Sequence, residues 1–256
     1  MSAVLGSVAD GIGVVTLNRP EAMNTFSPAL AGELDETLRS MERDESVQVV
    51  VLRGAGKNFS TGIDLKEYLS KERHEIRDFL ATMDLHNHRL AAMTKPVIAS
   101  VQGYALANGT GLALACDFIV ASEDAVFGTT AVNVGLICLE PGYQLARWIG
   151  EKRALQYVLT GDMIPAAKGL ELGFVYAIHP REGLEEGTMS LARKLMTKSA
   201  LSLRAGKRGF AHMEGLPLDR AVDVGGEHFA ALAASEDGRE GVAAFLEKRT
   251  PSFKGR

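Results

Sequence analysis

Residues 95–117 read KPVIASVQGYALANGTGLALACD, and only the first and last of these side chains are charged. The uncharged run has the length of a membrane-spanning helix, which needs about 20 apolar residues. Its polar side chains, Gln102, Asn108 and Thr110, would stay unpaired in lipid. We therefore expect a buried strand over residues 97–101, then a glycine-rich turn that leads into a buried helix.

Two β-branched runs nearer the N-terminus, residues 12–17 and 47–52, predict further strands. The segment between them has the signals of a helix start, because Ser27 can cap the helix and Pro28 suits its first position. Leucines then recur at helical spacing as far as Met41. The order strand, helix, strand is typical of an α/β domain.

The rest of the chain divides into a part with strands and a purely helical part. Strands are expected over residues 118–121 and 174–178, and helices over residues 72–93, 150–159 and 166–172. Beyond Pro180 helices are expected over residues 182–197, 200–213, 218–234 and 240–249. We therefore predict a core formed by residues 1–195 and a C-terminal helical region formed by residues 196–256.

Composition excludes several classes of protein. Of the 256 residues, 46% are hydrophobic and 23% are charged, which is typical of a globular protein and not of a disordered one. The net charge of -4 provides no positive field for a phosphate backbone, so nucleic acid binding is not expected. Cys116 and Cys138 are too few for a disulfide framework. Because the first residues also lack an export or transit signal, we expect a cytoplasmic protein with no membrane partner.

Motifs for nucleotide and metal chemistry are incomplete. Residues 53–58 resemble a phosphate-binding loop, but Asn58 stands where Ser or Thr would hold magnesium. The glycines after residue 108 hint at a dinucleotide site, but Leu114 fills the third small position. His86 and His88 lie two residues apart and so face different sides of a helix. No metal site is therefore predicted.

Two glycine-containing turns, residues 59–66 (FSTGIDLK) and residues 103–111 (GYALANGTG), each follow a predicted strand. A turn of this kind can present a backbone N–H to a ligand at the start of a helix. It can equally be a tight connection between a strand and a helix. Spacing alone leaves both interpretations open.

Five motifs in order along the chain carry a family resemblance. They are LNRP at 17–20 with MN at 23–24, residues 59–66, KPVIA at 95–99 with GYAL at 103–106, ACD at 115–117, and EDGREG at 236–241 with AFLEKR at 244–249. With them the chain resembles the enoyl-CoA hydratase/isomerase family, the crotonase superfamily, along nearly its whole length. The resemblance implies an α/β crotonase (ClpP/crotonase-like) fold of repeated ββα units. It also implies that the C-terminal helical region builds a homotrimer or homohexamer.

The resemblance further implies an acyl-CoA thioester as substrate, with coenzyme A present only as part of that substrate and no other cofactor. In the family two backbone N–H groups hold the thioester oxygen as it becomes an enolate, and the matching residues are Ile63 and Asn108. Asn108 stands where the family usually has Gly. If that turn needs a positive φ, Asn is one of the few other residues that accept it.

The acid/base positions depart from the family. Its hydratases use two Glu residues, whose positions here are Gly111 and Ala131, and neither of these can carry a proton. This argues against ordinary hydratase activity, since positioned acid/base groups commonly contribute about 10² to 10⁴ in rate. Glu140 is the nearest replacement, because its loop aligns with one where some isomerases and dehalogenases of the family place a carboxylate. A solvated Glu beside Pro141 is the alternative interpretation.

Further residues are carried over as parts of the CoA and acyl sites. Cys138, in contrast, is expected to be inert packing rather than a nucleophile. By resemblance the substrate-binding residues are Met23, Thr25, Thr61, Asp64, Leu65, Lys66, Tyr104, Leu106, Thr130, Val134, Phe245 and Lys248, of which the last two reach the CoA of a neighbouring subunit.

The sequence therefore indicates an acyl-CoA enzyme, a lyase or isomerase of fatty acid metabolism, that acts through a thioester enolate. One alternative is an acyl-CoA-binding homologue that has lost catalysis, motivated by Gly111 and Ala131. An alternative of another class is an RNA-binding or scaffolding protein, which the negative net charge disfavours. The acyl group, the reaction and the choice between trimer and hexamer stay open.

Overall fold

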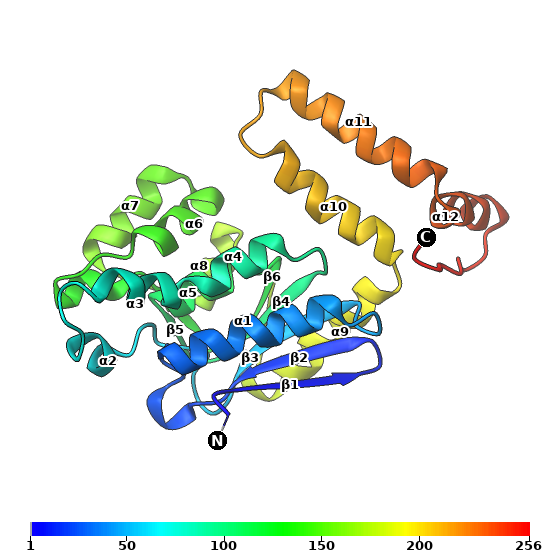
Figure 1. Ribbon diagram of the computed structural model, residues 1–256. Coiled ribbons are helices and arrows are strands. Elements are labelled where there is room, and N and C mark those ends of the chain that lie inside the picture. Colours follow the sequence, from blue (N-terminus) through cyan, green and yellow to red (C-terminus); the bar gives the residue numbers. More distant parts are fainter. Residues whose placement is uncertain (1) are drawn as a thin grey trace.

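The predicted strand, helix and strand of residues 12–52 lie next to one edge of the main sheet. The computed structural model describes residues 2–256, shown as a ribbon in Figure 1. The main sheet has the order β1-β2-β3-β4-β6-β9, in which β1 is antiparallel to β2 and all other neighbours are parallel. Its strands are β1 (Val4–Ala9), β2 (Ile12–Leu17), β3 (Val49–Gly54), β4 (Val97–Val101), β6 (Phe118–Ser122) and β9 (Ala177–His179).

A small second sheet lies next to the first, in the order β5-β7-β8. Its strands are β5 (Tyr104–Leu106), β7 (Val126–Gly128) and β8 (Met163–Pro165). The sequence did not predict these strands, because three-residue strands are too short to show a period of two. Strand β1 was also not predicted, because only Val4 of its six residues is buried and the strand shows no alternation of buried and exposed residues. The structure also moves β9 toward the C-terminus of the expected 174–178 segment.

Helices cover both faces of the main sheet. Val50 and Leu52 belong to the larger core cluster, with the buried leucines of α1, whereas Val49 and Val51 belong to a second cluster with Leu191 of α9. Alternate residues of one strand thus face opposite helical layers, as expected for a sheet buried on both sides. The helices of the core are α1 (Pro28–Arg43), α2 (Leu65–Leu69), α3 (Ile76–Met83), α4 (Leu85–Ala92), α5 (Asn108–Leu114), α6 (Leu139–Ile149), α7 (Glu151–Thr160), α8 (Ala166–Leu172) and α9 (Leu184–Met196). Three short 3₁₀ helices span Pro20–Ala22, Thr130–Val134 and Arg181–Gly183.

Local signals explain where the first helix begins. The Ser27 hydroxyl accepts a hydrogen bond from the Leu30 N–H at 3.2 Å, and Pro28 occupies the first turn, as predicted. The expected single helix over residues 72–93 is wrong, because the chain breaks at Asp84, with φ -96° and ψ 2°, into α3 and α4. Helix α6 was also not predicted, since Pro141 and Gly142 in its first turn obscure the periodic signal.

The last three helices extend away from the core (Figure 1). They are α10 (Ala200–Met213), α11 (Leu218–Ala234) and α12 (Glu236–Glu247). An ion pair of 2.8 Å between Lys207 Nζ and Asp117 Oδ2 ties α10 to the loop before β6. The predicted boundary at residues 195 and 196 falls at the end of α9, and the independence of the two parts stays a prediction. Within residues 2–256 no helix combines the length and apolar character needed to cross a bilayer.

Candidate active site

The two glycine-containing turns lie against each other at the carboxyl ends of β3 and β4. The Ser60 N–H donates to the Tyr104 carbonyl at 3.1 Å, and the Leu106 N–H donates to the Ser60 carbonyl at 2.9 Å. A Cβ atom added to Gly109 would lie 2.1 Å from the Ser60 oxygen, closer than any real contact. Glycine at position 109 is therefore what lets α5 approach the first turn.

The N–H groups of Ile63 and Asn108 are both left without a protein acceptor in the described part of the chain, residues 2–256. Their neighbours are paired: the Asp64 N–H donates to the Phe26 carbonyl at 2.9 Å, and the Ala107 N–H donates to the Gly128 carbonyl at 2.8 Å. An unpaired N–H is uncommon away from solvent, because losing its partner costs about 1 to 3 kcal/mol. Both residues line one cavity, so a ligand there can supply the missing acceptor.

The unusual backbone of the second turn belongs to Ala107 and not to Asn108. Ala107 has φ 48° and ψ -119°, a conformation that favours glycine. The turn does need a positive φ, but at position 107, so the tolerance of Asn for this conformation is not used at position 108. Asn108 begins α5 with ordinary helical geometry, and its side chain is free for another contact.

The cavity between α2, α3, α5 and α6 has a volume of about 690 Å³. Seven of the predicted site residues line it, namely Thr61, Ile63, Leu65, Asn108, Thr130, Val134 and Glu140. Most of the remaining wall is apolar and consists of Tyr68, Ile76, Leu80, Leu136, Ile137 and Leu139 with Ala107, Ala131, Gly135, Cys138 and Pro141. Two carboxyl groups, those of Glu140 and Asp84, line the same cavity.

Glu140 occupies the space that a side chain at position 111 would take. A Cβ atom built on Gly111 would lie 3.1 Å from Glu140 Oε2 and 3.3 Å from Pro141 Cγ. The Gln144 side-chain amide donates to Glu140 Oε1, while Oε2 is buried and has no partner within residues 2–256. Burial first, and then the charge of Asp84, raise the pKa of Glu140 to about 7. This carboxyl group can therefore hold or release a proton near neutrality.

Asp84 is a candidate site residue that the sequence analysis missed. The Asn108 side-chain amide donates to Asp84 Oδ1 at 3.2 Å, and burial raises the pKa of Asp84 above its ordinary value. The available signal was an Asp followed by a helical segment, which is typical of a helix start. It was overlooked because residues 72–93 were expected to form a single helix.

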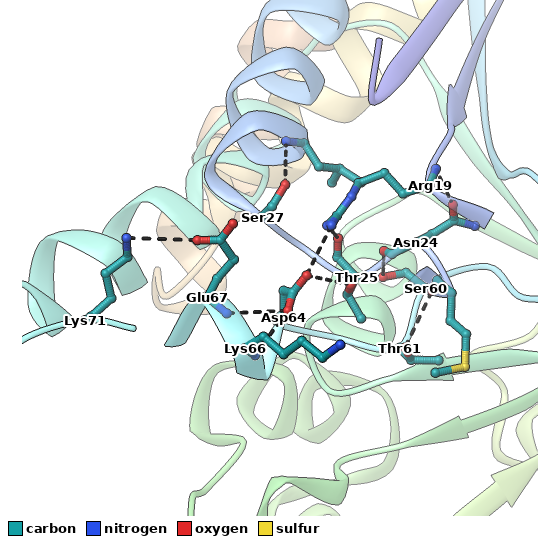
Figure 2. Close-up of polar contacts among 12 residues, drawn as sticks. Arg19, Asn24, Thr25, Ser27, Ser60, Thr61, Asp64, Lys66, Glu67 and Lys71 are labelled. Carbon is teal, nitrogen blue, oxygen red and sulfur yellow. Dashed lines mark hydrogen bonds and ion pairs between the residues drawn. The ribbon is translucent and has the colours of Figure 1, made fainter. Parts of the chain in front are cut away.

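Asp64 and Lys66 of the first turn do not line the cavity and take part in a polar network with Arg19 and Thr25 (Figure 2). Arg19, which the sequence analysis did not select, contacts Asp64 Oδ2 at 3.1 Å and donates to the Thr25 carbonyl at 2.7 Å. Asp64 also caps α2 by accepting from the Lys66 N–H at 3.1 Å. Burial raises the pKa of Asp64, but the Arg19 hydrogen bond and the cap outweigh burial and hold it below its usual range. Asp64 thus fixes the turn that carries Ile63.

Two other predicted residues of this region are at the surface. The Met23 carbonyl accepts from the Thr61 N–H at 3.2 Å, and Met23 is 48% exposed beside the first turn. Lys66 is exposed at the start of α2. Both positions are open to a ligand that extends from the cavity along the first turn.

The remaining predicted residues lie elsewhere. Tyr104 lines a separate small hollow with Arg181, and Leu106 lies against Gly128 of β7. Phe245 and Lys248 lie at the end of α12, which is far from α2 and α3 in Figure 1. Within one chain they do not line the cavity, so their predicted role requires the cavity of a neighbouring chain.

Cys138 has the environment of a packing residue. Its side chain is buried in the cavity wall, and burial raises the pKa of its thiol above the ordinary value. A raised thiol pKa lowers the fraction of the nucleophilic thiolate at neutral pH. This agrees with the inert role expected from the sequence.

Comparison with known proteins assigns the fold. A family model described as enoyl-CoA hydratase/isomerase matches residues 7–256. A crystal structure of an enoyl-CoA hydratase from Mycobacterium smegmatis superposes with a TM-score of 0.94 at 33% sequence identity, and the match covers 98% of each chain. The predicted crotonase fold, with its parallel sheet and helical C-terminal region, is therefore confirmed.

Relatives of similar length include proteins named for different reactions. The 2,3-dehydroadipyl-CoA hydratase of Escherichia coli is 37% identical, and the match covers 100% of both chains. The 1,2-epoxyphenylacetyl-CoA isomerase of the same species is 33% identical, again over 100% of both chains. The chain belongs to the enoyl-CoA hydratase/isomerase family.

Proposed function

We propose that this protein is an acyl-CoA enzyme that forms a thioester enolate, with Glu140 moving the proton at Cα. The observation that carries the proposal is the position of Glu140 Oε2, 3.1 Å from where a side chain at Gly111 would begin. A glycine at position 111 makes room for a carboxyl group supplied by α6. The missing Glu at that position is therefore replaced in space, although not in sequence.

The N–H groups of Ile63 and Asn108 support the enolate part of the proposal. Both lack an acceptor among residues 2–256 and both line the cavity that contains Glu140. A donor aimed at developing negative charge in a dry site contributes about 2.7 to 4 kcal/mol to lowering the barrier. In this arrangement the thioester oxygen accepts from both N–H groups while its Cα faces Glu140.

The raised pKa of Glu140 supports its role as proton carrier. A general acid or base works best when its pKa lies near the working pH, and burial brings that of Glu140 to about 7. Gln144 donates to Oε1, which orients the carboxyl group and leaves Oε2 for the substrate. No group beyond the chain and the CoA thioester takes part in this proposed step.

The cavity wall indicates an uncharged acyl group. Among the described residues that line it there is no Lys or Arg, and the two ionisable carboxyl groups repel a further carboxylate. We therefore propose apolar acyl-CoA thioesters as substrates. An ω-carboxylated acyl-CoA, of the kind in the name of the Escherichia coli relative, is expected to be a poor substrate.

Proton exchange at Cα tests the proposed function. Phenylacetyl-CoA is incubated in D₂O with the wild-type protein, Glu140→Gln, or Glu151→Gln, whose Glu lies exposed at the start of α7. The proposal predicts deuterium uptake with the wild type and the Glu151 control, and a loss of at least about 100-fold in Glu140→Gln. Tight binding of several acyl-CoAs by calorimetry without any exchange or turnover would instead support the non-catalytic alternative.

Assembly and location are also proposed from the resemblance. Exposed apolar side chains on the last three helices, such as Phe210 at 78% and Phe229 at 74%, support assembly of several chains through this region. A trimer or hexamer would also bring Phe245 and Lys248 to a neighbouring cavity. A cytoplasmic location stays a prediction of the sequence.

A further inference from the structure

The break between α3 and α4 directs a carboxyl group into the cavity. Asp84 stands at the N-cap of α4, where an Asp side chain ordinarily accepts from the N–H groups of the first turn. Here the Asp84 side chain makes no capping hydrogen bond, and its Oδ1 accepts from the Asn108 side chain at 3.2 Å instead. Helix α4 therefore begins without a side-chain cap, and capping does not explain why the Asp84 carboxyl group lies at the cavity wall.

Asp84 lines the same cavity as the other groups of the proposed reaction centre. It contacts Asn108, whose backbone N–H is a proposed oxyanion donor, and it lines the same cavity as Glu140. The two carboxyl groups come from different elements, the α3–α4 break and the first turn of α6. A thioester bound through Ile63 and Asn108 therefore lies within reach of two acid/base groups.

We infer that Asp84 and Glu140 act as a catalytic pair that hydrates an α,β-unsaturated acyl-CoA, with Asp84 as the base for water and Glu140 as the acid for Cα. This inference rests on the proposed function, in which the enolate is held by Ile63 and Asn108. The pair would make hydration possible, although the sequence alone, with Gly111 and Ala131 at the usual Glu positions, disfavours it.

The protons and electrons of this reaction balance with water, the acyl-CoA and the carboxyl groups of Asp84 and Glu140. The Asp84 carboxylate takes one proton from water while the water oxygen bonds to Cβ. The electron pair of the Cα–Cβ double bond moves into the thioester, giving the enolate held by the two N–H groups. Glu140 then gives its proton to Cα, and the product is the 3-hydroxyacyl-CoA. Transfer of a proton from Asp84 to Glu140, directly or through water, restores the starting state.

The ionisation of the two groups supports this division of roles. Burial raises the pKa of both, and that of Glu140 reaches about 7 with the charge of Asp84 as the second cause. At Asp84 the Asn108 hydrogen bond and the charge of His88 oppose the effect of burial on the pKa and favour the ionised form. The other titratable group near Glu140 is the Cys138 thiol, whose pKa is raised, so that it stays neutral. Groups with separated pKa values can serve as acid and base at the same pH.

Two reactions measured on the same variants test the pair. Crotonyl-CoA hydration requires both carboxyl groups, whereas exchange of the Cα protons of phenylacetyl-CoA requires Glu140 and the two N–H groups only. The variants are Asp84→Asn, Glu140→Gln and the control Asp78→Asn, whose Asp is exposed on α3. We expect Asp84→Asn to lose at least about 100-fold in hydration kcat and to keep exchange within about threefold. Glu140→Gln should lose both reactions.

Three results would overturn the pair. In the first, Asp84→Asn hydrates crotonyl-CoA as fast as the control does. In the second, it loses exchange and hydration equally, which would make Asp84 a residue that only positions Asn108. In the third, the wild type exchanges Cα protons but does not hydrate, so that the proposed function stands without the pair. A wild type that performs neither reaction overturns the proposed function itself. Because exchange also reports a folded site, a misfolded Asp84→Asn is recognised by loss of both reactions together with a lowered melting temperature.

Discussion

Position 111 on α5 lacks the Glu of the family's hydratases, and the carboxyl group proposed to move the proton, that of Glu140, comes from α6 instead. Glu140 Oε2 lies 3.1 Å from the built Cβ of Gly111, so even an alanine at position 111 would require this carboxyl group to shift by a few tenths of an ångström. The same burial that raises the pKa of Glu140 makes its ionised form costly in the folded protein. Function and stability are therefore expected to oppose each other at this residue.

The stability of Glu140→Gln tests this opposition. The ordinary pKa of 4.5 applies to the unfolded chain, and the folded value is about 7. As pH rises between these values, the unfolded state loses the proton first, so the wild type loses stability across this window and stays less stable above it. Since one pH unit corresponds to about 1.4 kcal/mol, Glu140→Gln should be more stable at about pH 8 by on the order of 3 kcal/mol. Urea unfolding at about pH 8 and about pH 4 measures this, and the gain should vanish at the lower pH. A gain that is equal at both values would contradict ionisation as its cause.

The pH dependence of activity follows from the same group. Exchange at Cα needs the ionised Glu140 to accept a proton, so its kcat/KM should rise through about pH 7 to a plateau. Hydration needs the protonated form, so its kcat/KM should fall above about the same pH. Profiles of both reactions on one preparation check this. If kcat/KM rises with pH in both reactions, or falls in both, then Glu140 does not carry the Cα proton in both.

At the scale of elements, the site depends on how closely α5 approaches the first turn. The Ser60 carbonyl lies 2.1 Å from where a Cβ of Gly109 would be, so Gly109→Ala must push α5 away. The distance between the two proposed oxyanion donors should then grow, and kcat should fall by at least about tenfold per lost donor. The matched control is Gly32→Ala on α1, where nothing lies within 4 Å of the built Cβ. Exchange kinetics and thermal melting are measured on both, and unchanged kinetics in Gly109→Ala would refute the close approach.

Sequence reasoning predicted the elements with strong periods and missed those that depend on packing. Helix α1 begins at Pro28 with Ser27 as its cap, because both signals act within one helical turn. The break at Asp84 was missed because the apolar spacing continues across it. Ala107 has a positive φ, and its N–H donates to the Gly128 carbonyl at 2.8 Å, a contact that no local pattern reveals.

The candidate site was likewise predictable only where it follows the family's motifs. The two turns that carry Ile63 and Asn108 match in sequence, and the structure places both residues in one cavity. Glu140 could be selected from the sequence as a replacement. Its contact with position 111, however, joins two helices across 29 positions of the chain, and no local pattern shows it. Asp84 has no motif, and it enters the site only through the fold.

At the scale of the whole molecule, the last three helices offer a surface that one chain does not bury. Leu218 and Phe245 are each 82% exposed, and α10, α11 and α12 extend away from the core (Figure 1). Apolar surface of this kind in a soluble domain is typical of an interaction site. Assembly through it would also decide whether the predicted roles of Phe245 and Lys248 are possible.

A charge placed on this surface tests assembly. Phe229 on α11 is 74% exposed, and Phe229→Asp should prevent association because a buried unpaired carboxylate is costly. Light scattering should give a multiple of the 27.4 kDa chain mass for the wild type and for Glu227→Gln, but a single chain mass for Phe229→Asp. A wild type that elutes as one chain at all concentrations would contradict the assembly.

A crystal structure with a bound, non-reacting acyl-CoA thioester tests the central claim most directly. The thioester oxygen should lie about 3 Å from the backbone nitrogens of both Ile63 and Asn108, and Glu140 Oε2 should lie within about 3 Å of the hydrogen-bearing face of Cα. A thioester oxygen that contacts neither nitrogen, or a Glu140 carboxyl group turned away from Cα toward solvent, would contradict the account.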